Sequence, residues 1–432
     1  MKYWKVVLII IVLFGAGLFW WDRSMLQPES VVVKDTYVAA GTANPGEIIV
    51  YKAENDTLTE QKRVDTGYKF VFTVRIGDVY NTGKNTIIAG VGDSFYKEPY
   101  GCQVVAYNLD LKKKETIDSL SDLRCKDLTI DDIDQDGTQE VILATHGEGR
   151  IMMYRYVAGE WQKEEIEHNF IAEFDQENNQ NHRVPNDTLP CERCVVQSAV
   201  HIVKTADIDG GGEKEIIATI SSPLELQDVD EVSFVLLYRK VKGVWEKEII
   251  DQAVNMEFRS IELGDIDRNG IQDIVIGTGS PREVPSAIIA YEYSSGLWEK
   301  KEIFTDPKAK NMKGLVVTDY EQNGKDSIVL ATGFPDSVLY HLVWDGSSFT
   351  VTELDKASSV VQHGGQHNAM AALVLPESKN IITAGMSTFP EEKIGWEATD
   401  KGFIVYHTNK NGTFSPRIID NPSILGMDRF TE

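Results

Sequence analysis

Short acidic turns recur along the chain, and they are the residues best suited to chemistry. In one turn, Asp132, Asp134 and Asp136 stand at alternate positions, Gly137 follows, and Glu140 takes position 9. Carboxylates at positions 1, 3 and 5 can surround one point, and glycine at position 6 permits a sharp bend. Position 7 offers a backbone carbonyl, and an acid at position 9 can bind through both oxygens. Such hard oxygen ligands in a flexible loop favour Ca²⁺ over Mg²⁺ or Zn²⁺.

The same nine-residue pattern returns at Asp207, Asp265 and Asp319, so we predict calcium ligands in four loops. The predicted metal ligands are Asp132, Asp134, Asp136, Thr138, Glu140, Asp207, Asp209, Gly211, Glu213, Glu215, Asp265, Asp267, Asn269, Ile271, Asp273, Asp319, Glu321 and Asn323. A water would have to complete the loop that carries Gly211. The Asp319 loop is the poorest match because Ser327 replaces the last acid. The alternative is that all four are ordinary Asp, Asn and Gly turns without an ion.

The acidic turns belong to a longer repeat, whose first aspartate recurs at positions 78, 132, 207, 265 and 319. Each turn precedes an apolar strand such as 141–145, a second strand such as 150–156, and a Gly-aromatic turn with an alternating strand such as 159–166. Four strands per repeat form one antiparallel blade, and radial packing of blades buries both faces. The segment 168–195 reads as a loop insertion.

Counting copies predicts an all-β, seven-bladed propeller over residues 35–432, with six blades as the alternative. The C-terminal segment 423–429 resembles 260–268, the innermost strand of another repeat. We therefore expect the last strand to complete the first blade, which leaves no free sheet edge.

The pattern Asp-x-Asp-x-Asp-Gly-x-x-Asp/Glu followed by a strand resembles the calcium loop of FG-GAP and VCBS repeats, as in integrin α-subunits. The resemblance covers about residues 35–432. It implies that Ca²⁺ is structural and fixes a turn between two strands. The literal Phe-Gly and Gly-Ala-Pro marks of the family are absent, which weakens a link to integrins proper. An EF-hand is excluded because position 12 falls on Leu143, Ala218 or Ile276, inside an apolar strand.

The N-terminus predicts a membrane anchor. Lys2 and Lys5 precede an apolar run from Val6 to Trp21, which as a helix would span roughly 24 Å at ~1.5 Å per residue. We assign residues 1–22 to a single-pass anchor with a cytoplasmic N-terminus and 23–34 to a linker. The propeller would then lie outside the cytoplasm, in a periplasmic, extracellular or lumenal space. A cleaved signal peptide is the alternative, and it exports the propeller too.

The four cysteines fit an oxidising compartment. We favour the disulfides Cys191–Cys194 and Cys102–Cys125 among the three possible pairings. A zinc site at the C-x-x-C of Cys191 and Cys194 is the alternative, although no second C-x-x-C or spaced His pair accompanies it.

Basic residues recur six positions before the first aspartate of four repeats, namely Lys126, His201, Arg259 and Lys313. On a closed ring these positions converge near the channel mouth. We expect them to make salt bridges to nearby acids or to snorkel, and an anion site at the channel mouth is the alternative. His363 and His367 enter the same face and are expected in a loop.

Composition narrows the function. The chain has 432 residues and a formal charge of −24, which argues against a nucleic-acid partner. We expect a binding or scaffolding module, for adhesion or as a subunit of a membrane-associated assembly, whose partner is a protein or a glycan. A carbohydrate-active enzyme on a propeller scaffold is the alternative, although no catalytic motif stands out. A third possibility is an accessory subunit docked through 168–195.

Overall fold

The computed structural model describes residues 36–54, 57–93, 101–121, 123–178, 198–222, 232–279, 285–309, 311–333, 338–356, 366–375, 378–388, 402–420 and 423–431. The predicted anchor at 1–22, the linker at 23–34, Cys191, Cys194 and His363 lie outside these residues. Among the residues described, no helix combines the length and the apolar character needed to cross a bilayer.

Antiparallel sheets of successive strands build the unit Thr36–Phe430. The chain opens with two long strands, β1 (Thr36–Glu54) and β2 (Thr57–Gly77). The next strands are β3 (Thr86–Gly92), β4 (Cys102–Asn108), β5 (Lys113–Leu120), β6 (Arg124–Asp131), β7 (Glu140–Gly147), β8 (Ile151–Val157) and β9 (Glu160–Glu167). After the helix α2 (Phe170–Asn178) come β10 (Ser198–Ala206), β11 (Glu215–Ser221), β12 (Val232–Val241), β13 (Val244–Val254), β14 (Glu257–Gly264), β15 (Asp273–Gly279), β16 (Ser286–Ser294) and β17 (Leu297–Asp306). The last strands are β18 (Asn311–Thr318), β19 (Ser327–Gly333), β20 (Val338–Trp344), β21 (Phe349–Lys356), β22 (Gln366–Leu375), β23 (Asn380–Thr388), β24 (Gly402–Lys410), β25 (Thr413–Asp420) and β26 (Ser423–Thr431).

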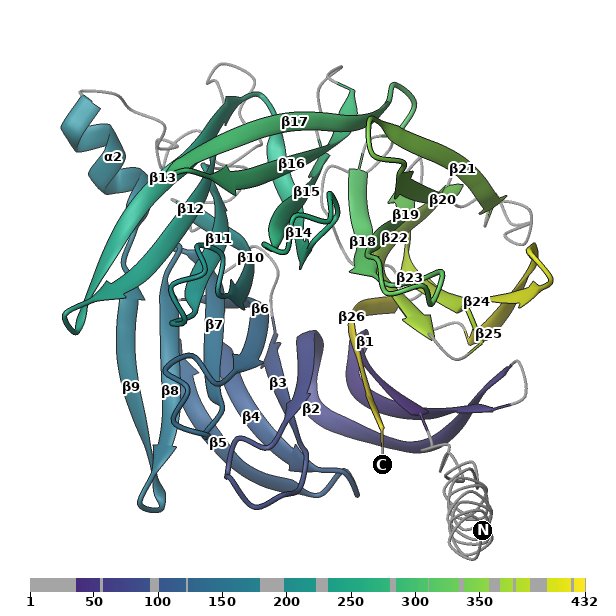
Figure 1. Ribbon diagram of the computed structural model, residues 1–432. Helices are drawn as coiled ribbons and strands as arrows, with labels where there is room; N and C mark the ends of the chain where they lie inside the picture. The colour runs from purple at the N-terminus through teal and green to yellow at the C-terminus, as the bar shows by residue number, and fades with distance from the viewer. Residues whose placement is uncertain are drawn as a thin grey trace, which may run out of the picture. The chain divides into compact units, whose positions relative to one another are not determined.

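The sheets are arranged around a common axis, and this makes the unit a β-propeller (Figure 1). Strands β6, β10, β14 and β18 lie toward the axis, and β9, β13, β17 and β21 lie at the periphery. Within each group, such as β6-β7-β8-β9, consecutive strands pair antiparallel. The final strand β26 is hydrogen-bonded beside β1, so the end of the chain joins its beginning in one sheet, as the sequence predicts.

Burial follows from this radial packing. Every residue of β11, β15 and β19 is buried, because both faces of this second strand of a group meet neighbouring sheets. Outer strands such as β9 alternate between exposed and partly buried positions instead. One core cluster combines Ile88 and Val104 with Val141 and Leu143, so hydrophobic contacts run from one sheet to the next.

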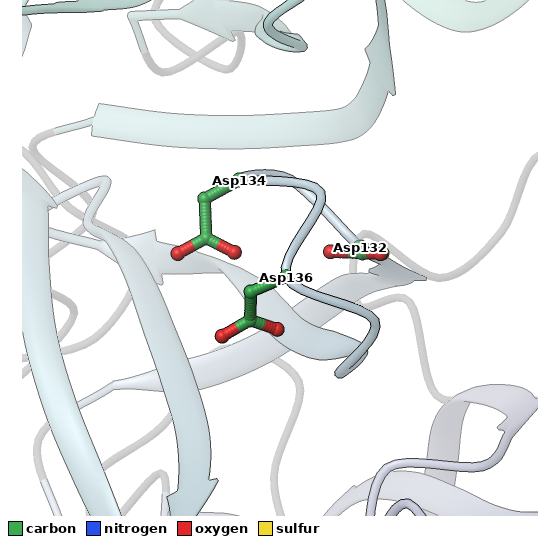
Figure 2. A group of neighbouring side chains, drawn as sticks. All are labelled: Asp132, Asp134 and Asp136. Atoms are coloured by element: carbon green, nitrogen blue, oxygen red, sulfur yellow. The ribbon is translucent and has the colours of Figure 1, made fainter.

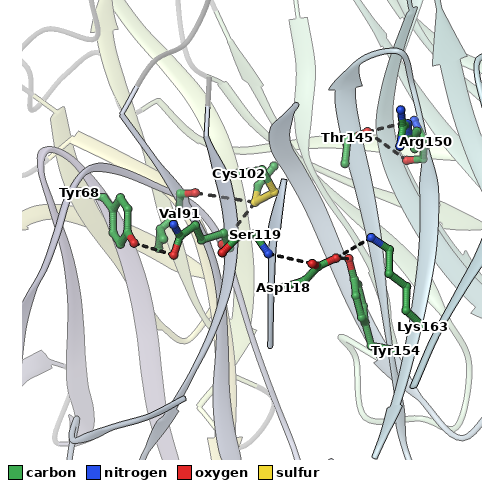
Figure 3. The surroundings of a disulfide bond; sticks show 11 residues. Tyr68, Val91, Cys102, Asp118, Ser119, Thr145, Arg150, Tyr154 and Lys163 are labelled. Atoms are coloured by element: carbon green, nitrogen blue, oxygen red, sulfur yellow. Dashed lines mark hydrogen bonds and ion pairs between the residues drawn. A yellow bond between two sulfur atoms is a disulfide. The ribbon is translucent and has the colours of Figure 1, made fainter. Parts of the chain in front are cut away.

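Buried tyrosines add polar links between neighbouring sheets. Tyr154 on β8 is 1% exposed, and its hydroxyl donates to Asp118 Oδ2 on β5 over 2.7 Å (Figure 3). The same link recurs between Tyr238 and Glu167 at 2.9 Å and between Tyr291 and Asp251 at 2.7 Å. Tryptophans of the Gly-aromatic turns repeat the theme at the periphery, in the pairs Trp161–Glu115, Trp245–Glu164 and Trp298–Glu248.

Cys102 and Cys125 form a disulfide, the pairing that the sequence favours (Figure 3). It joins β4 to β6, two strands of adjacent sheets. Both cysteines are fully buried.

The segment 168–195 corrects one expectation. The sequence predicts a loop insertion there, whereas the structure has the nine-residue helix α2 near its start. Phe170 and Phe174 of this helix pack against Phe234, with ring centroids 5.0 and 4.7 Å apart. A polar two-turn helix carries too few apolar positions for a reliable 3.6-residue period, so its tertiary contacts determine it.

Candidate functional site

Carboxylates gather into an acidic group in each of the first three predicted loops. The groups are Asp132–Asp134–Asp136, Asp207–Asp209–Glu215 and Asp265–Asp267–Asp273, and within each group one ligand atom per residue lies within 4.8 Å of the others. Figure 2 shows the side chains of the first group projecting from one tight turn between β6 and β7. The sequence spacing therefore positions carboxylates as predicted, although the first group includes Asp136 rather than Glu140.

The first aspartate of each loop is held by the glycine five residues later. Gly137 N donates to Asp132 Oδ2 over 2.9 Å, and the glycine has a φ of 88°, in the left-handed region. The same hydrogen bond recurs from Gly212 to Asp207 at 3.0 Å, from Gly270 to Asp265 at 2.9 Å and from Gly324 to Asp319 at 2.7 Å. The other oxygen has no hydrogen-bond partner among the described residues in Asp132 and Asp207, whereas in Asp265 and Asp319 it accepts from the backbone N–H four residues later.

The acid at position 9 closes the loop onto the buried residue at position 2. Glu140 Oε2 accepts from Ile133 N at 3.0 Å. Glu215 accepts from Ile208 N, and Asp273 from Ile266 N, at the same distance. Position 9 therefore has a structural task with one of its carboxylate oxygens.

Several of the remaining oxygens are buried and have no hydrogen-bond partner among the described residues. They are Asp132 Oδ1, Asp207 Oδ1 and Asp273 Oδ1, one in each acidic group. Asp273 is only 1% exposed. Burial, followed by the charge of Asp267, raises the pKa of Asp273 from 3.8 to about 7. Buried carboxylates normally have a counter-charge, so these residues fit a bound divalent cation. When bound, the cation would neutralise the acids and fix the turn.

Positions 5 and 7 contact each other in two loops. Asp136 Oδ1 accepts from Thr138 N at 2.8 Å, and Asn269 Oδ1 accepts from Ile271 N at 2.7 Å. In the second loop Gly211 N donates to Asp209 Oδ1 at 2.8 Å. Glu213 is exposed and outside the acidic group.

The Asp319 loop is organised differently. Asp319 Oδ1 accepts from Asn323 N at 2.9 Å, and Oδ2 accepts from Gly324 N, so the backbone satisfies both oxygens. Glu321 pairs with Lys379 at 3.4 Å instead of completing an acidic group. The turn at Asp78 is likewise held by backbone donors on both oxygens, from Thr82 and Gly83. Backbone donors likewise hold both oxygens of Asp265, from Asn269 and Gly270, so it is the unpaired oxygen of the position-9 acid Asp273 that distinguishes that loop from the Asp319 loop.

Sequence reasoning missed the charged side chains that face the acidic loops from the second strand after each loop. Arg155 on β8 donates to Glu140 Oε1 at 2.7 Å and pairs with Asp134 at 2.5 Å. Arg239 on β12 lies 3.5 Å from Asp209. The corresponding residue on β16 is Glu292, which adds negative charge near Asp273. Two loops thus have a guanidinium as a partial counter-charge, and the Asp265 loop has an additional acid.

The predicted basic residues lie at β-bulges of four inner strands. The pairing of β6 with β7 skips Lys126, that of β10 with β11 skips His201, and that of β14 with β15 skips Arg259. Lys313 lies in the irregular stretch of β18 between Asn311 and Gly314. A bulge redirects a side chain that would otherwise alternate with its neighbours.

Two residues that the sequence did not single out join these four, and we call the six residues the cation cluster: Arg124, Lys126, His146, His201, Arg259 and Lys313. Arg124 hydrogen-bonds the ring of His146, whose centroid lies 5.1 Å from that of His201. Burial, followed by the charges of Arg124 and Arg259, lowers the pKa of Lys126 from 10.5 to about 7. The pKa values of His201 and Lys313 are lowered well below their ordinary values by burial and by the other cations.

Comparisons with known proteins identify the fold alone. No family model matches the sequence, and no curated protein matches it significantly. The structure resembles a candidate 6-phosphogluconolactonase from Bacteroides fragilis with a TM-score of 0.55, at 12% identity over 93% of this chain and 99% of that one. It also resembles a protein from Lactobacillus plantarum with a TM-score of 0.57, at 9% identity over 92% of this chain and 99% of that one. These similarities place the chain among folds of the same architecture and leave its function to the sites described above.

Proposed function

We propose that this protein is a calcium-stabilised β-propeller of the FG-GAP/VCBS kind that acts as a binding or scaffolding module outside the cytoplasm. The observation that carries the calcium assignment is the buried, unpaired carboxylate oxygen in each of three acidic loops. A loop needed only as a turn would satisfy its own oxygens, as the Asp319 loop does. Ca²⁺ in these loops would connect the inner strand of a sheet to the next strand.

We propose seven blades, closed by β26. The strand pairings group β6–β9, β10–β13, β14–β17, β18–β21 and β22–β25 in fours. The second half of β2 joins β3, β4 and β5, and β26 completes the group formed by β1 and the first half of β2. Deleting residues 423–432 should open the ring and lower the urea midpoint of unfolding. An unchanged midpoint would contradict closure by this strand.

Tethering is proposed from the sequence, because the apolar run 6–21 has the length and flanking charge of an anchor. An anchored chain should remain in the membrane pellet after alkaline carbonate extraction. A chain released quantitatively, with its N-terminus at about residue 23, would instead show cleavage.

A binding role is tested by affinity purification from detergent-solubilised membranes, in calcium and again in chelator. We expect a stoichiometric protein partner that is retained in calcium and lost in chelator. Turnover of oligosaccharides by the purified chain, without such a partner, would overturn the scaffolding role in favour of a carbohydrate-active enzyme.

A further inference from the structure

The cation cluster lies at the opposite end of the inner strands from the acidic loops. Strand β6 begins at Arg124, and the acidic loop starts at Asp132, directly after the strand ends. Lys126 and Asp132 are six residues apart, which corresponds to roughly 20 Å of extended chain at ~3.3 Å per residue. The propeller axis therefore has a cationic end and an acidic end, and the two sites are separate.

The described acids leave Lys126 of the cation cluster without an ion pair. Glu257 contacts the cluster by pairing with Arg259 and lies 3.8 Å from His201 Nε2. Within the described chain, Lys126 has no carboxylate within ion-pair distance. Other acids of the inner strands have partners elsewhere, since Asp127 pairs with Arg75 at 2.7 Å.

A buried polar atom at the cluster also lacks a partner. His201 is 4% exposed, and its Nε2 is 2.7 Å from Ser221 Oγ. Its Nδ1 has no hydrogen-bond partner among the described residues. Buried polar atoms are normally hydrogen-bonded, so this ring nitrogen offers a hydrogen-bonding position to a ligand beside the basic side chains.

We propose that the cation cluster binds a small oxyanion, namely a phosphate or sulfate group, either as the free ion or as part of a larger ligand. Arginine offers several N–H donors in a planar fork that matches an oxyanion, and lysine adds a mobile point charge. Four adjacent β-bulges supply these side chains from separate strands, so the oxyanion would connect neighbouring sheets near the axis. The inference deepens the proposed binding role by naming the ligand class.

Calorimetric titration of the full chain in detergent tests the proposal at constant ionic strength set with chloride. Sulfate is the probe in calcium, and phosphate is the probe in chelator, because calcium and phosphate precipitate. We expect saturable binding of both anions, and Lys126→Met should weaken it roughly tenfold or more through loss of one charged hydrogen bond. Lys126→Arg keeps the charge and should bind within about threefold of the parent. Lys242→Met, at an exposed turn between β12 and β13, is the matched control and should bind like the parent.

The results of these titrations distinguish a site for the free ion from a site for a larger ligand that carries the anionic group. Glycerol phosphate that binds more tightly than phosphate, with glycerol inactive, would indicate a ligand that carries the group, and equal affinities would indicate the free ion. No binding above chloride, or equal binding by Lys126→Met and the parent, would overturn the anion site. Calcium dependence of stability is measured without these anions, so failure of the calcium proposal would be recognised separately.

Discussion

Replacing Asp273 by Asn should stabilise the protein without calcium, and calcium should abolish that advantage over the parent. Asp273 is 1% exposed, and its Oδ1 has no partner among the described residues. Its pKa rises from 3.8 to about 7, which at about 1.36 kcal/mol per pKa unit corresponds to a cost of about 4 kcal/mol for the ionised form. The folded-state pKa is raised, so this cost grows as the pH rises from about 4 to about 7 and is complete above that. Asn removes the charge and keeps an oxygen for Ile266 N.

In chelator at pH 8, Asp273→Asn should therefore be more stable than the parent by up to about 4 kcal/mol. In calcium this advantage should disappear, because the variant has lost a ligand and with it the stabilisation that binding confers, about 4 kcal/mol when calcium is at 1,000 times its Kd. The assay is urea unfolding of both proteins in calcium and in EDTA, followed by tryptophan fluorescence.

Glu140→Gln is the matched control, because Glu140 already pairs with Arg155 at 2.7 Å. Removing this carboxylate leaves a guanidinium without one partner, so the control should lose about 1–3 kcal/mol in both conditions. If Asp273→Asn were also less stable than the parent in EDTA, the reasoning from the unpaired buried oxygen would be refuted.

Three further predictions concern other parts of the structure. Tyr154→Phe should lower the free energy of unfolding by about 2 kcal/mol, because Asp118 loses a buried donor; a change below about 0.5 kcal/mol in urea unfolding would contradict this link between sheets. Replacing Cys102 and Cys125 by Ser should cost about 3 kcal/mol, the loop entropy for a sequence separation of 23, and reduction of the parent should have the same effect. Lys126→Met should stabilise the anion-free protein at pH 6, because the folded-state pKa is lowered to about 7 and the charged form is penalised below that value. This gain should disappear as the pH approaches 10.5, and a pH-independent gain would instead indicate packing.

The sequence predicted the acidic groups because their geometry is local. All ligands of a loop come from nine consecutive residues, and the glycine at position 6 fixes the turn. The sequence repeat predicted the fold, because copies of one four-strand unit bury both faces of each sheet by packing around an axis. The closure by β26 followed from the likeness between 423–429 and 260–268.

The contacts that the sequence did not predict are those that depend on how neighbouring strands pair and pack. Arg155 is 15 residues from Glu140, and only the register of β8 on β7 brings them together. Arg124 and His146 are register partners on β6 and β7, but the contacts of His146 and Glu257 with His201 cross from one repeat to the next. A comparison of the repeats at the position of Arg155 could have found the contrast with Glu292, because both residues follow a tyrosine in the same strand of their repeat.

Counting bound calcium tests the central claim most directly. Flow dialysis of the full chain with radioactive calcium should show about three ions per molecule, one for each acidic group. Replacing Asp132, Asp207 and Asp265 together by Asn should abolish this binding, while Asp319→Asn should leave it unchanged. A parent that binds no calcium at millimolar concentration, or a triple variant that binds as much as the parent, would contradict the account.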